Sequence, residues 1–186
     1  MSVKQIPVKI SAVIVDWDGT VTARLARPIL DFPIKYIKEA IEAHQEIEFT
    51  RGTRLKLLKT HAAIIDRVSQ NTPLRPTDSP IINLLNLLST QHLPWFVMSD
   101  HDTNKKLMPH PQLRPLSQIS CREHALKPLT DAFHAVFCQL PSPRHEYLYI
   151  GDRLDTDGQA CAELGIPFLD IQDLNNELVK EIVQRF

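Results

Sequence analysis

Residues 13–22, which read VIVDWDGTVT, are the stretch of sequence that decides the fold. They extend an apolar, β-branched run at residues 9–15 that is typical of a strand buried on both faces of a parallel sheet. Asp16 and Asp18 end this strand two positions apart, so we expect both side chains on the same side of the pleat. Open α/β sheets bind their ligands at the carboxyl ends of the strands. The stretch therefore predicts a strand that delivers two acidic groups to a site.

Similar apolar runs recur along the chain and alternate with helical periodicity. Strands are expected at residues 94–99, 146–150 and 166–171, with a weaker one at 116–120. Ser79 and Pro80 open an apolar stripe that runs to Leu88, with the serine suited to the N-cap and the proline to the first helical position. Three further helices are indicated by the stripes Ile34/Ile37/Ile41, Leu55/Leu58/Ala62/Ile65 and Leu174/Leu178/Ile182. Strands that alternate with helices predict an α/β, Rossmann-like, doubly wound parallel sheet.

One part of the chain breaks this alternation. The helical stripes between residues 22 and 78 have no strand pattern among them, and the proline-rich residues 71–80 (NTPLRPTDSP) are typical of a linker. We therefore expect a catalytic core at residues 1–21 and 79–186, with a small helical cap inserted at residues 22–78.

Composition and charge restrict the class of protein. The 186 residues carry a formal net charge of -1, so no strong field favours nucleic acid or an anionic membrane as a partner. Asp16 and Asp18 interrupt the N-terminal apolar run, so neither a membrane span nor a signal peptide is expected. The three cysteines are widely spaced, which is typical of neither a zinc site nor a disulfide framework, and the expected location is the cytoplasm.

A second acidic motif lies in residues 149–165, YIGDRLDTDGQACAELG. Asp152 ends a predicted strand, and Asp157 stands where the next helix begins. Together with Asp16 and Asp18 this predicts an oxygen-rich site of the kind that Mg²⁺ prefers. Two structural explanations compete: an Asp-Gly turn for the first motif, and acidic residues favoured by a helix N-terminus for the second. The second explanation accounts for Asp157 more easily than for Asp152.

With both motifs in view, the chain resembles the haloacid dehalogenase superfamily, whose four motifs occur here in order. The first is the segment from Asp16 to Thr22, and the second is Ser99, the hydroxyl residue that closes the strand WFVMS. The third is Lys127 in ALKPLTDAF, a lysine-proline segment with a phenylalanine six residues on. The fourth is GDRLDTD at residues 151–157. The resemblance spans residues 9 to about 171.

The resemblance implies a role for each motif residue. Asp16 is implied as the nucleophile and Asp18 as the general acid and base. Lys127 is implied to offset phosphoryl charge, while Ser99 and Thr20 donate hydrogen bonds to the phosphoryl group. The implied Mg²⁺ ligands are Asp16, the backbone carbonyl of Asp18, and Asp152, with Asp157 in support.

Some features depart from the pattern or leave alternatives open. Trp17 is bulkier than is usual in the family. The run Asp100-His101-Asp102 beside Ser99 is unusually polar, and either a role at the site or a capped helix start explains it. The interval between Ser99 and Lys127 is short, so Lys105 and Lys106 remain alternatives for the cationic role.

The cap supplies a further hypothesis. Residues 50–58 (TRGTRLKLL) resemble the specificity loop of relatives of β-phosphoglucomutase and phosphoglycolate phosphatase. Gly52 would let that loop approach a substrate, and Arg51 or Arg54 would bind a second anionic group. A solvated basic helix start is an equally good explanation.

The expected function is a Mg²⁺-dependent phosphatase that acts on a small phosphorylated metabolite. Asp18 favours phosphoryl transfer, because the superfamily's dehalogenases lack an acid two residues after the nucleophile. One alternative is a sugar phosphomutase, which would isomerise its substrate rather than release phosphate. Another is a catalytically weak homologue that binds a partner, although two close carboxylates serve no purpose in a binding module.

Overall fold

The computed structural model describes residues 6–23, 74–100, 111–121, 127 and 129–186. Its centre is a five-stranded sheet in which every neighbouring pair is parallel, with the strand order β3-β2-β1-β4-β5. The strands are β1 (Ala12–Asp16), β2 (Trp95–Ser99), β3 (Ser117–Ser120), β4 (Tyr147–Gly151) and β5 (Phe168–Asp170). This confirms the predicted α/β, Rossmann-like class.

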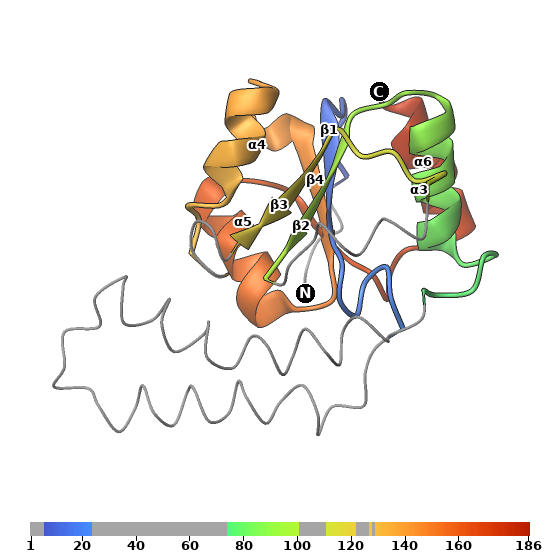
Figure 1. Cartoon of the computed structure of the whole chain (residues 1–186). Coiled ribbons are helices and arrows are strands. Elements are labelled where there is room, and N and C mark those ends of the chain that lie inside the picture. Colours follow the sequence, from blue (N-terminus) through green and yellow to red (C-terminus); the bar gives the residue numbers. More distant parts are fainter. Residues whose placement is uncertain (1–5, 24–73, 101–110, 122–126, 128) are drawn as a thin grey trace, which may run out of the picture.

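Helices cover both faces of the sheet, as Figure 1 shows. On one side α3 (Pro80–Thr90) packs against α6 (Asn176–Gln184), and on the other lie α4 (Phe133–Gln139) and α5 (Gln159–Leu164). Two short turns complete the described elements, the 3-10 helix Arg144–Glu146 and the π-helix Leu154–Gly158. The α4 helix was not predicted from the sequence.

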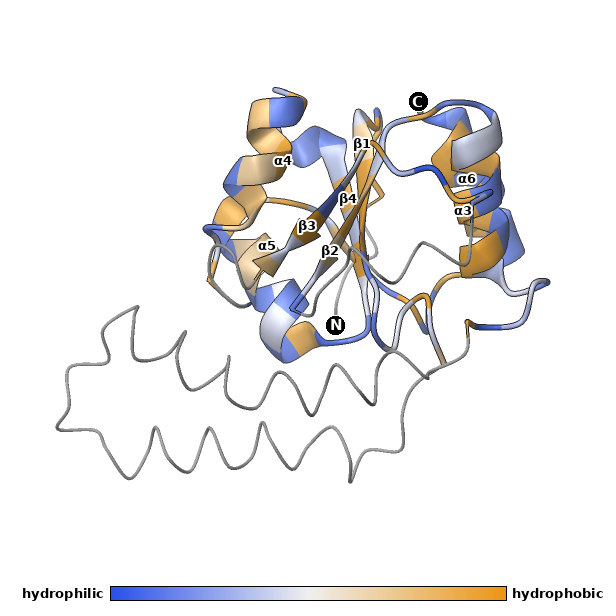
Figure 2. Ribbon diagram, viewed as in Figure 1, coloured by the Kyte–Doolittle hydropathy of each residue, from blue (hydrophilic) through white to orange (hydrophobic). Residues whose placement is uncertain are grey.

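Successive residues of the central strands alternate between two apolar clusters. Val13 and Val15 of β1 pack with α3 and α6, whereas Ala12 and Ile14 pack with α4 and α5. A strand enclosed on both faces needs apolar residues at every position, which explains the continuous hydrophobic run. Figure 2 shows the apolar residues of α3 and α6 turned toward the sheet.

Two strands begin two or more residues later than predicted, and one predicted helix cap is not formed. The first strand begins at Ala12 rather than at residue 9, because the Ile10 amide donates to the Arg185 carbonyl (2.8 Å) rather than to a strand. The last strand begins at Phe168 rather than at residue 166, because the Ile166 amide closes the end of α5 on the Cys161 carbonyl (2.9 Å). Ser79 occupies the N-cap position of α3, but its side chain makes no capping hydrogen bond, so that prediction was wrong in its chemistry.

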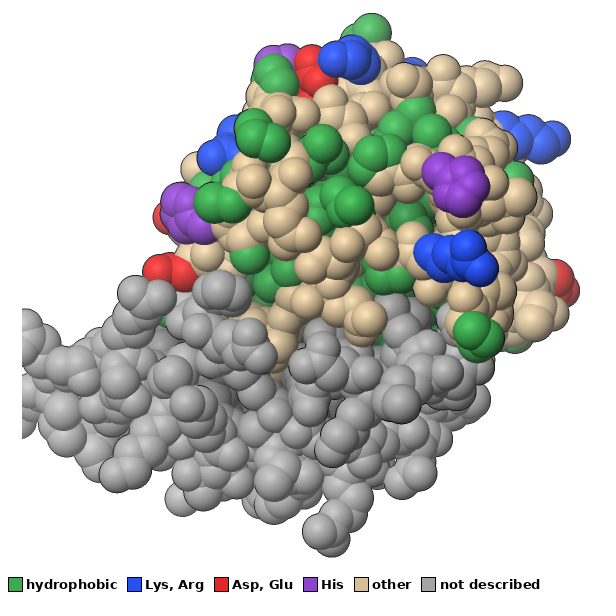
Figure 3. All heavy atoms as spheres, turned by 45° about the horizontal axis from the view of Figure 1, so that its top comes forward, with side chains coloured by type: hydrophobic (Ala, Val, Ile, Leu, Met, Phe, Trp, Pro, Cys, Tyr) green, Lys and Arg blue, Asp and Glu red, His purple; other side chains and the backbone are tan. Residues whose placement is uncertain are grey.

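The predicted helical cap at residues 22–78 lies almost wholly outside the described residues and stays a prediction. Its two ends meet in the described part, where Thr22 and Leu74 form an antiparallel bridge. Among the described helices, none is long and apolar enough to cross a membrane. On the face of the described part seen in Figure 3, basic and acidic side chains are scattered among hydrophobic ones and form no patch of one sign.

Candidate active site

The candidate site lies where the strand order reverses. The chain proceeds outward from β1 through β2 to β3, whereas β4 returns to the other side of β1 and leads to β5. A crevice at such a switch point is where open α/β sheets bind ligands. Asp16 is the last residue of β1, and Asp152 directly follows β4. The parallel pairing of the two strands therefore brings these acids to one edge of the sheet.

Three carboxylates converge at this edge. One oxygen each of Asp16, Asp152 and Asp157 lies within 4.8 Å of the others. Asp16 and Asp157 are 5% and 1% exposed, so both are withdrawn from bulk water. Carboxylate oxygens at such separations suit a hard divalent cation, and Mg²⁺ fits this set of ligands. The structure thus includes Asp157 in the same cluster as Asp16 and Asp152, although the sequence assigned it only a supporting part.

Two glycines make this convergence possible. Gly19 has a φ of +84°, and a Cβ at its position would lie 2.5 Å from Oδ2 of Asp152. A Cβ at Gly151 would lie 2.5 Å from Oδ2 of Asp157. Any side chain at either position would collide with a carboxylate of the site. The acidic motifs therefore need glycine for space, and Gly19 needs it for its backbone conformation as well.

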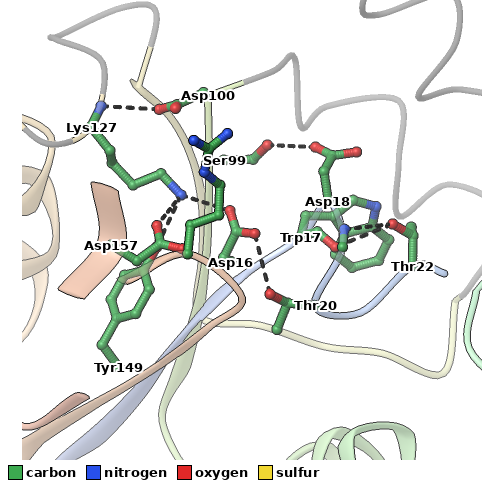
Figure 4. A network of polar contacts seen from close by, with 12 residues as sticks. Asp16, Trp17, Asp18, Thr20, Thr22, Ser99, Asp100, Lys127, Tyr149 and Asp157 are labelled. Atoms are coloured by element: carbon green, nitrogen blue, oxygen red, sulfur yellow. Dashed lines mark hydrogen bonds and ion pairs between the residues drawn. The ribbon is translucent and has the colours of Figure 1, made fainter. Parts of the chain in front are cut away.

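The ammonium of Lys127 lies between two carboxylates of the site, as Figure 4 shows. Its Nζ lies 2.6 Å from Oδ1 of Asp16 and 2.6 Å from Oδ1 of Asp157. Its main-chain amide donates to Oδ1 of Asp100 at 3.2 Å, which ties the lysine segment to the residue after β2. Asp100 of the polar run is thus a neighbour of the site, while His101, Asp102, Lys105 and Lys106 lie outside the described residues.

The charges of this cluster shift one another's pKa values. Burial raises the pKa of Asp16, Lys127 acts against this, and the carboxylates of Asp157, Asp152 and Asp18 raise it further, to well above the usual range. Burial alone would lower the pKa of Lys127, but Asp157 and Asp16 outweigh it and hold that pKa well above its usual value. Carboxylates thus crowd round one buried ammonium, an arrangement that a divalent cation would relieve.

Asp18 lies apart from this cluster. Ser99, which is the last residue of β2, donates a hydrogen bond from Oγ to Oδ2 of Asp18 at 3.0 Å. Figure 4 shows the Asp18 side chain directed toward Ser99 rather than toward Lys127. Thr20 is fully buried and donates from Oγ1 to Oδ2 of Asp16 at 3.3 Å. The nucleophile and acid/base candidates thus have separate hydrogen-bond partners.

The residues that follow β1, including Asp18 and Thr20, form a tight turn. The amides of Val21 and Thr22 donate to the Trp17 carbonyl at 2.9 and 3.1 Å, and the Gly19 amide donates to Oγ1 of Thr22 at 3.1 Å. The Trp17 side chain is 2% exposed and packs in the apolar cluster beside α3, so its bulk is accommodated in the core.

Two residues at the site were missed in the sequence. The hydroxyl of Tyr149 on β4 accepts from Nζ of Lys127 at 3.2 Å and donates to Oδ1 of Asp157 at 3.1 Å. Burial, and after it Asp157, raises the pKa of Tyr149 well above its usual value, so the hydroxyl keeps its proton. Arg75 donates to the carbonyls of Gly19 and Thr20 at 2.7 and 2.8 Å. Tyr149 has a sequence signal, a polar-tipped residue in a fully buried strand, whereas Arg75 has none.

The proposed cap residues Arg51, Gly52 and Arg54 lie outside the described residues, so their role stays a prediction. Of the remaining predicted site residues, the structure brings Asp16, Asp152, Asp157, Lys127 and Thr20 into one cluster. Asp18 and Ser99 adjoin that cluster as a hydrogen-bonded pair.

No family model and no curated protein sequence matches the chain. Solved structures do. The putative hydrolase YfnB from Bacillus subtilis, described as bound to magnesium, has a TM-score of 0.63 at 16% identity and covers 94% of this chain and 99% of its own. A putative phosphoglycolate phosphatase from Lactobacillus plantarum has a TM-score of 0.61 at 16% identity, with 96% and 100% covered. The L-2-haloacid dehalogenase RSc1362 has a TM-score of 0.62 at 13% identity, with 94% and 99% covered.

These likenesses span nearly the whole length of both chains in each pair. Phosphatases and dehalogenases stand side by side among them, so the fold is common to both chemistries. The protein therefore has the α/β fold of the haloacid dehalogenase-like hydrolases.

Proposed function

We propose that this protein is a Mg²⁺-dependent phosphatase that hydrolyses a small phosphomonoester metabolite through an aspartyl-phosphate on Asp16. The observation that carries the proposal is the meeting of three carboxylates at the carboxyl ends of β1 and β4, with oxygens within 4.8 Å of one another. Two of them, Asp16 and Asp157, also contact the buried ammonium of Lys127. A divalent cation would offset the negative charge of the carboxylates. The phosphoryl oxygens would in turn offset the positive charge of that cation and of Lys127.

In the first step a carboxylate oxygen of Asp16 forms a bond to phosphorus, and the bond from phosphorus to the ester oxygen breaks. Asp18 gives its proton to the departing alcohol, which prevents an alkoxide from accumulating. In the second step Asp18 takes a proton from water, the water oxygen attacks phosphorus, and Asp16 leaves as a free carboxylate with release of phosphate. The position of Asp18, two residues after Asp16 and held by Ser99, supports its use in both steps.

The remaining groups lower the electrostatic barrier. Lys127 contacts Oδ1 of Asp16, so its charge lies beside the nucleophile and would stabilise the transition state. Thr20 orients the other Asp16 oxygen through its hydroxyl. A magnesium ion held by Asp16, Asp152, Asp157 and the carbonyl of Asp18 would supply Lewis-acid stabilisation of the phosphoryl oxygens.

Dehalogenation is the main competing chemistry, because dehalogenases share the fold. Hydrolysis at carbon needs no proton for a halide leaving group, so it has no use for a second acid. Asp18 therefore favours a substrate whose leaving group is an alcohol. The same site would suit a phosphomutase if water were excluded, and product analysis distinguishes the two. The proposal also includes a reducing compartment such as the cytoplasm, in keeping with the free cysteines of the described part.

The test is hydrolysis of an aryl phosphate by the full chain, followed by a screen of phosphorylated sugars, nucleotides and small acids. We expect phosphate release with Mg²⁺, loss of activity in EDTA and recovery when Mg²⁺ is restored in excess. Asp16→Asn should lower kcat by at least about a thousandfold, because the amide is not a nucleophile. Its far-UV circular dichroism should match the wild type, which shows that folding is retained.

Activity that is indifferent to chelation, or retained in Asp16→Asn, would refute the proposal. Isomerised sugar phosphate without free phosphate would redirect it to the phosphomutase. Release of halide from a 2-haloacid, without action on any phosphate ester, would assign the dehalogenase chemistry instead.

A further inference from the structure

We propose that Tyr149 is a positioning residue that aims the ammonium of Lys127 at Asp16. The inference rests on the proposed function, because it specifies how the cation of that site is oriented. Tyr149 lies on β4, fully buried, with its hydroxyl between Nζ of Lys127 and Oδ1 of Asp157. It lies at the strand end of the second acidic motif, before the acids of GDRLDTD, and the mechanism given above assigns it no step.

The argument begins with the donors of the lysine. An ammonium has three N–H donors and no acceptor. Its neighbours in the structure are three acceptors, namely Oδ1 of Asp16 at 2.6 Å, Oδ1 of Asp157 at 2.6 Å and the Tyr149 hydroxyl at 3.2 Å. With Asp157 and Tyr149 each taking one donor, the third N–H points to Asp16. The tyrosine hydroxyl thus fixes the rotation of the ammonium about its final bond.

The same hydroxyl also holds Asp157 in place. Its own proton goes to Oδ1 of Asp157 at 3.1 Å, so the hydroxyl, the ammonium and the carboxylate form a closed triangle of polar contacts. A closed network of this kind fixes each member more firmly than the separate pairs would. Without the hydroxyl, one N–H of a buried ammonium would have no acceptor at that corner, and the lysine would turn to seek another.

The ring of Tyr149 is held independently of its hydroxyl. It packs beside Phe133 and Phe168, with ring centroids 5.7 and 6.2 Å away, in the apolar cluster next to α4 and α5. The ammonium lies 5.8 Å from the centroid of the same ring. Phenylalanine would keep all of this packing and remove only the hydroxyl. Tyr149→Phe therefore isolates the polar contact.

The chain offers a matched control on the same strand. Tyr147 lies two residues earlier, so its side chain leaves the same face of the sheet, and it too is fully buried. Its hydroxyl donates to the carbonyl of Leu140, away from the acidic cluster, and its ring packs on Phe137. Tyr147→Phe is the same chemical change without any contact to Lys127.

The first experiment compares kcat and KM of both variants with an aryl phosphate and Mg²⁺, together with their melting temperatures. We expect Tyr149→Phe to lower kcat about tenfold, the usual effect of losing one hydrogen bond to a charged group, with little change in KM. Tyr147→Phe should keep the wild-type kcat. An unchanged kcat in Tyr149→Phe, or an equal fall in both variants, would overturn the inference.

The second experiment does not depend on turnover. In protein labelled with ¹⁵N-lysine, the buried ammonium of Lys127 should give its own Nζ–H signal, assigned by its absence in Lys127→Met. Tyr149→Phe should shift or broaden that signal, whereas Tyr147→Phe should leave it in place. An unmoved signal in Tyr149→Phe would refute the positioning role. If the wild type hydrolyses no phosphate ester the proposed function fails, and the signal still decides the role of Tyr149.

Discussion

Asp16 must be ionised to attack phosphorus, yet its surroundings oppose ionisation. Burial raises its pKa first, the ammonium of Lys127 acts against this, and three carboxylates raise it again. Ionised Asp16 therefore destabilises the folded state, and a bound cation or phosphoryl group would change the size of this effect. This makes the charge of one side chain measurable through the stability of the whole protein.

We predict a pH dependence of stability that belongs to Asp16. A group whose pKa is raised on folding contributes stability that is full below its ordinary pKa of about 4 and is lost as pH rises through the folded value. Asparagine is neutral at every pH and lacks this dependence. In EDTA, the free energy of unfolding of the wild type relative to Asp16→Asn should fall as pH rises above the ordinary pKa of about 4.

Urea unfolding of both proteins at each pH measures this difference. Excess Mg²⁺ should reduce the fall, because the cation binds the deprotonated carboxylates and stabilises the folded state. A difference that stays constant as pH rises above this value in EDTA would contradict the raised pKa of Asp16.

The sequence made some of these residues easier to predict than others. Asp16 and Asp152 could be predicted because each acid stands at the end of a buried strand. The apolar residues just before it in the sequence therefore indicate its position. The partners of Tyr149 are 22 residues away for Lys127 and 8 residues away for Asp157. No local pattern encodes that meeting, because Tyr149 lies on β4 whereas Lys127 and Asp157 lie in segments outside the strands.

Among the structural elements, the turn after β1 is stabilised by Arg75, a residue far along the chain. Arg75 donates through Nε to the Thr20 carbonyl at 2.8 Å and through Nη2 to the Gly19 carbonyl at 2.7 Å. Its amide donates to the Val21 carbonyl at 3.0 Å, next to the bridge between Thr22 and Leu74. The segment that returns to the core is thus fastened to the turn that carries Asp18.

Arg75→Ala should lower both the stability and the activity of the protein. Loss of two hydrogen bonds from a guanidinium should cost about 2 to 4 kcal/mol in the free energy of unfolding, and kcat should fall as the turn loosens. Arg75→Lys keeps the charge but not the planar fork, so we expect an intermediate result. Urea unfolding and kcat with an aryl phosphate measure the two effects.

Arg114→Ala is the control for this prediction, because Arg114 is exposed and bonds to Ser89 through its main-chain amide, which alanine keeps. It should match the wild type in both measurements. Wild-type stability and kcat in Arg75→Ala would show that the turn holds itself, through the hydrogen bonds to the Trp17 carbonyl.

Prediction was weaker for the boundaries of elements than for their existence. All five strands were predicted. The central strands β1, β2 and β4 are buried at every position and leave a continuous apolar run, whereas β3 is polar and partly buried and gave a weaker signal. The first began three residues late, since Ile10 pairs with Arg185 at the other end of the chain. The α4 helix is only seven residues long and has no side-chain cap. Its buried Phe133, Val136 and Phe137 have helical spacing but span little more than one turn, so the periodic signal is short. The helical cap stays a prediction.

At the scale of the whole molecule, the sheet divides the described core into two apolar clusters. The cluster beside α4 and α5 contains two of the three cysteines, Cys121 and Cys161, both fully buried. The same cluster holds the ring of Tyr149 and so underlies the acidic site. A reagent can therefore reach these thiols only when the apolar cluster beside α4 and α5 opens.

The two buried thiols should report this opening. Burial is the main cause that raises the pKa of both; Asp100 adds to it for Cys121 and Asp157 for Cys161, so few thiolates form near neutral pH. Cys138 is exposed. We expect an aromatic disulfide reagent at about pH 8 to label one thiol rapidly and the other two only as the protein opens. Mass spectrometry of the labelled peptides identifies each site, and Cys138→Ser should abolish the rapid phase.

Since both slow thiols, Cys121 and Cys161, belong to one cluster, they should react at similar rates and speed up together in urea. Labelling of Cys121 or Cys161 as fast as Cys138 in the folded protein would mean that this side of the sheet is not closed.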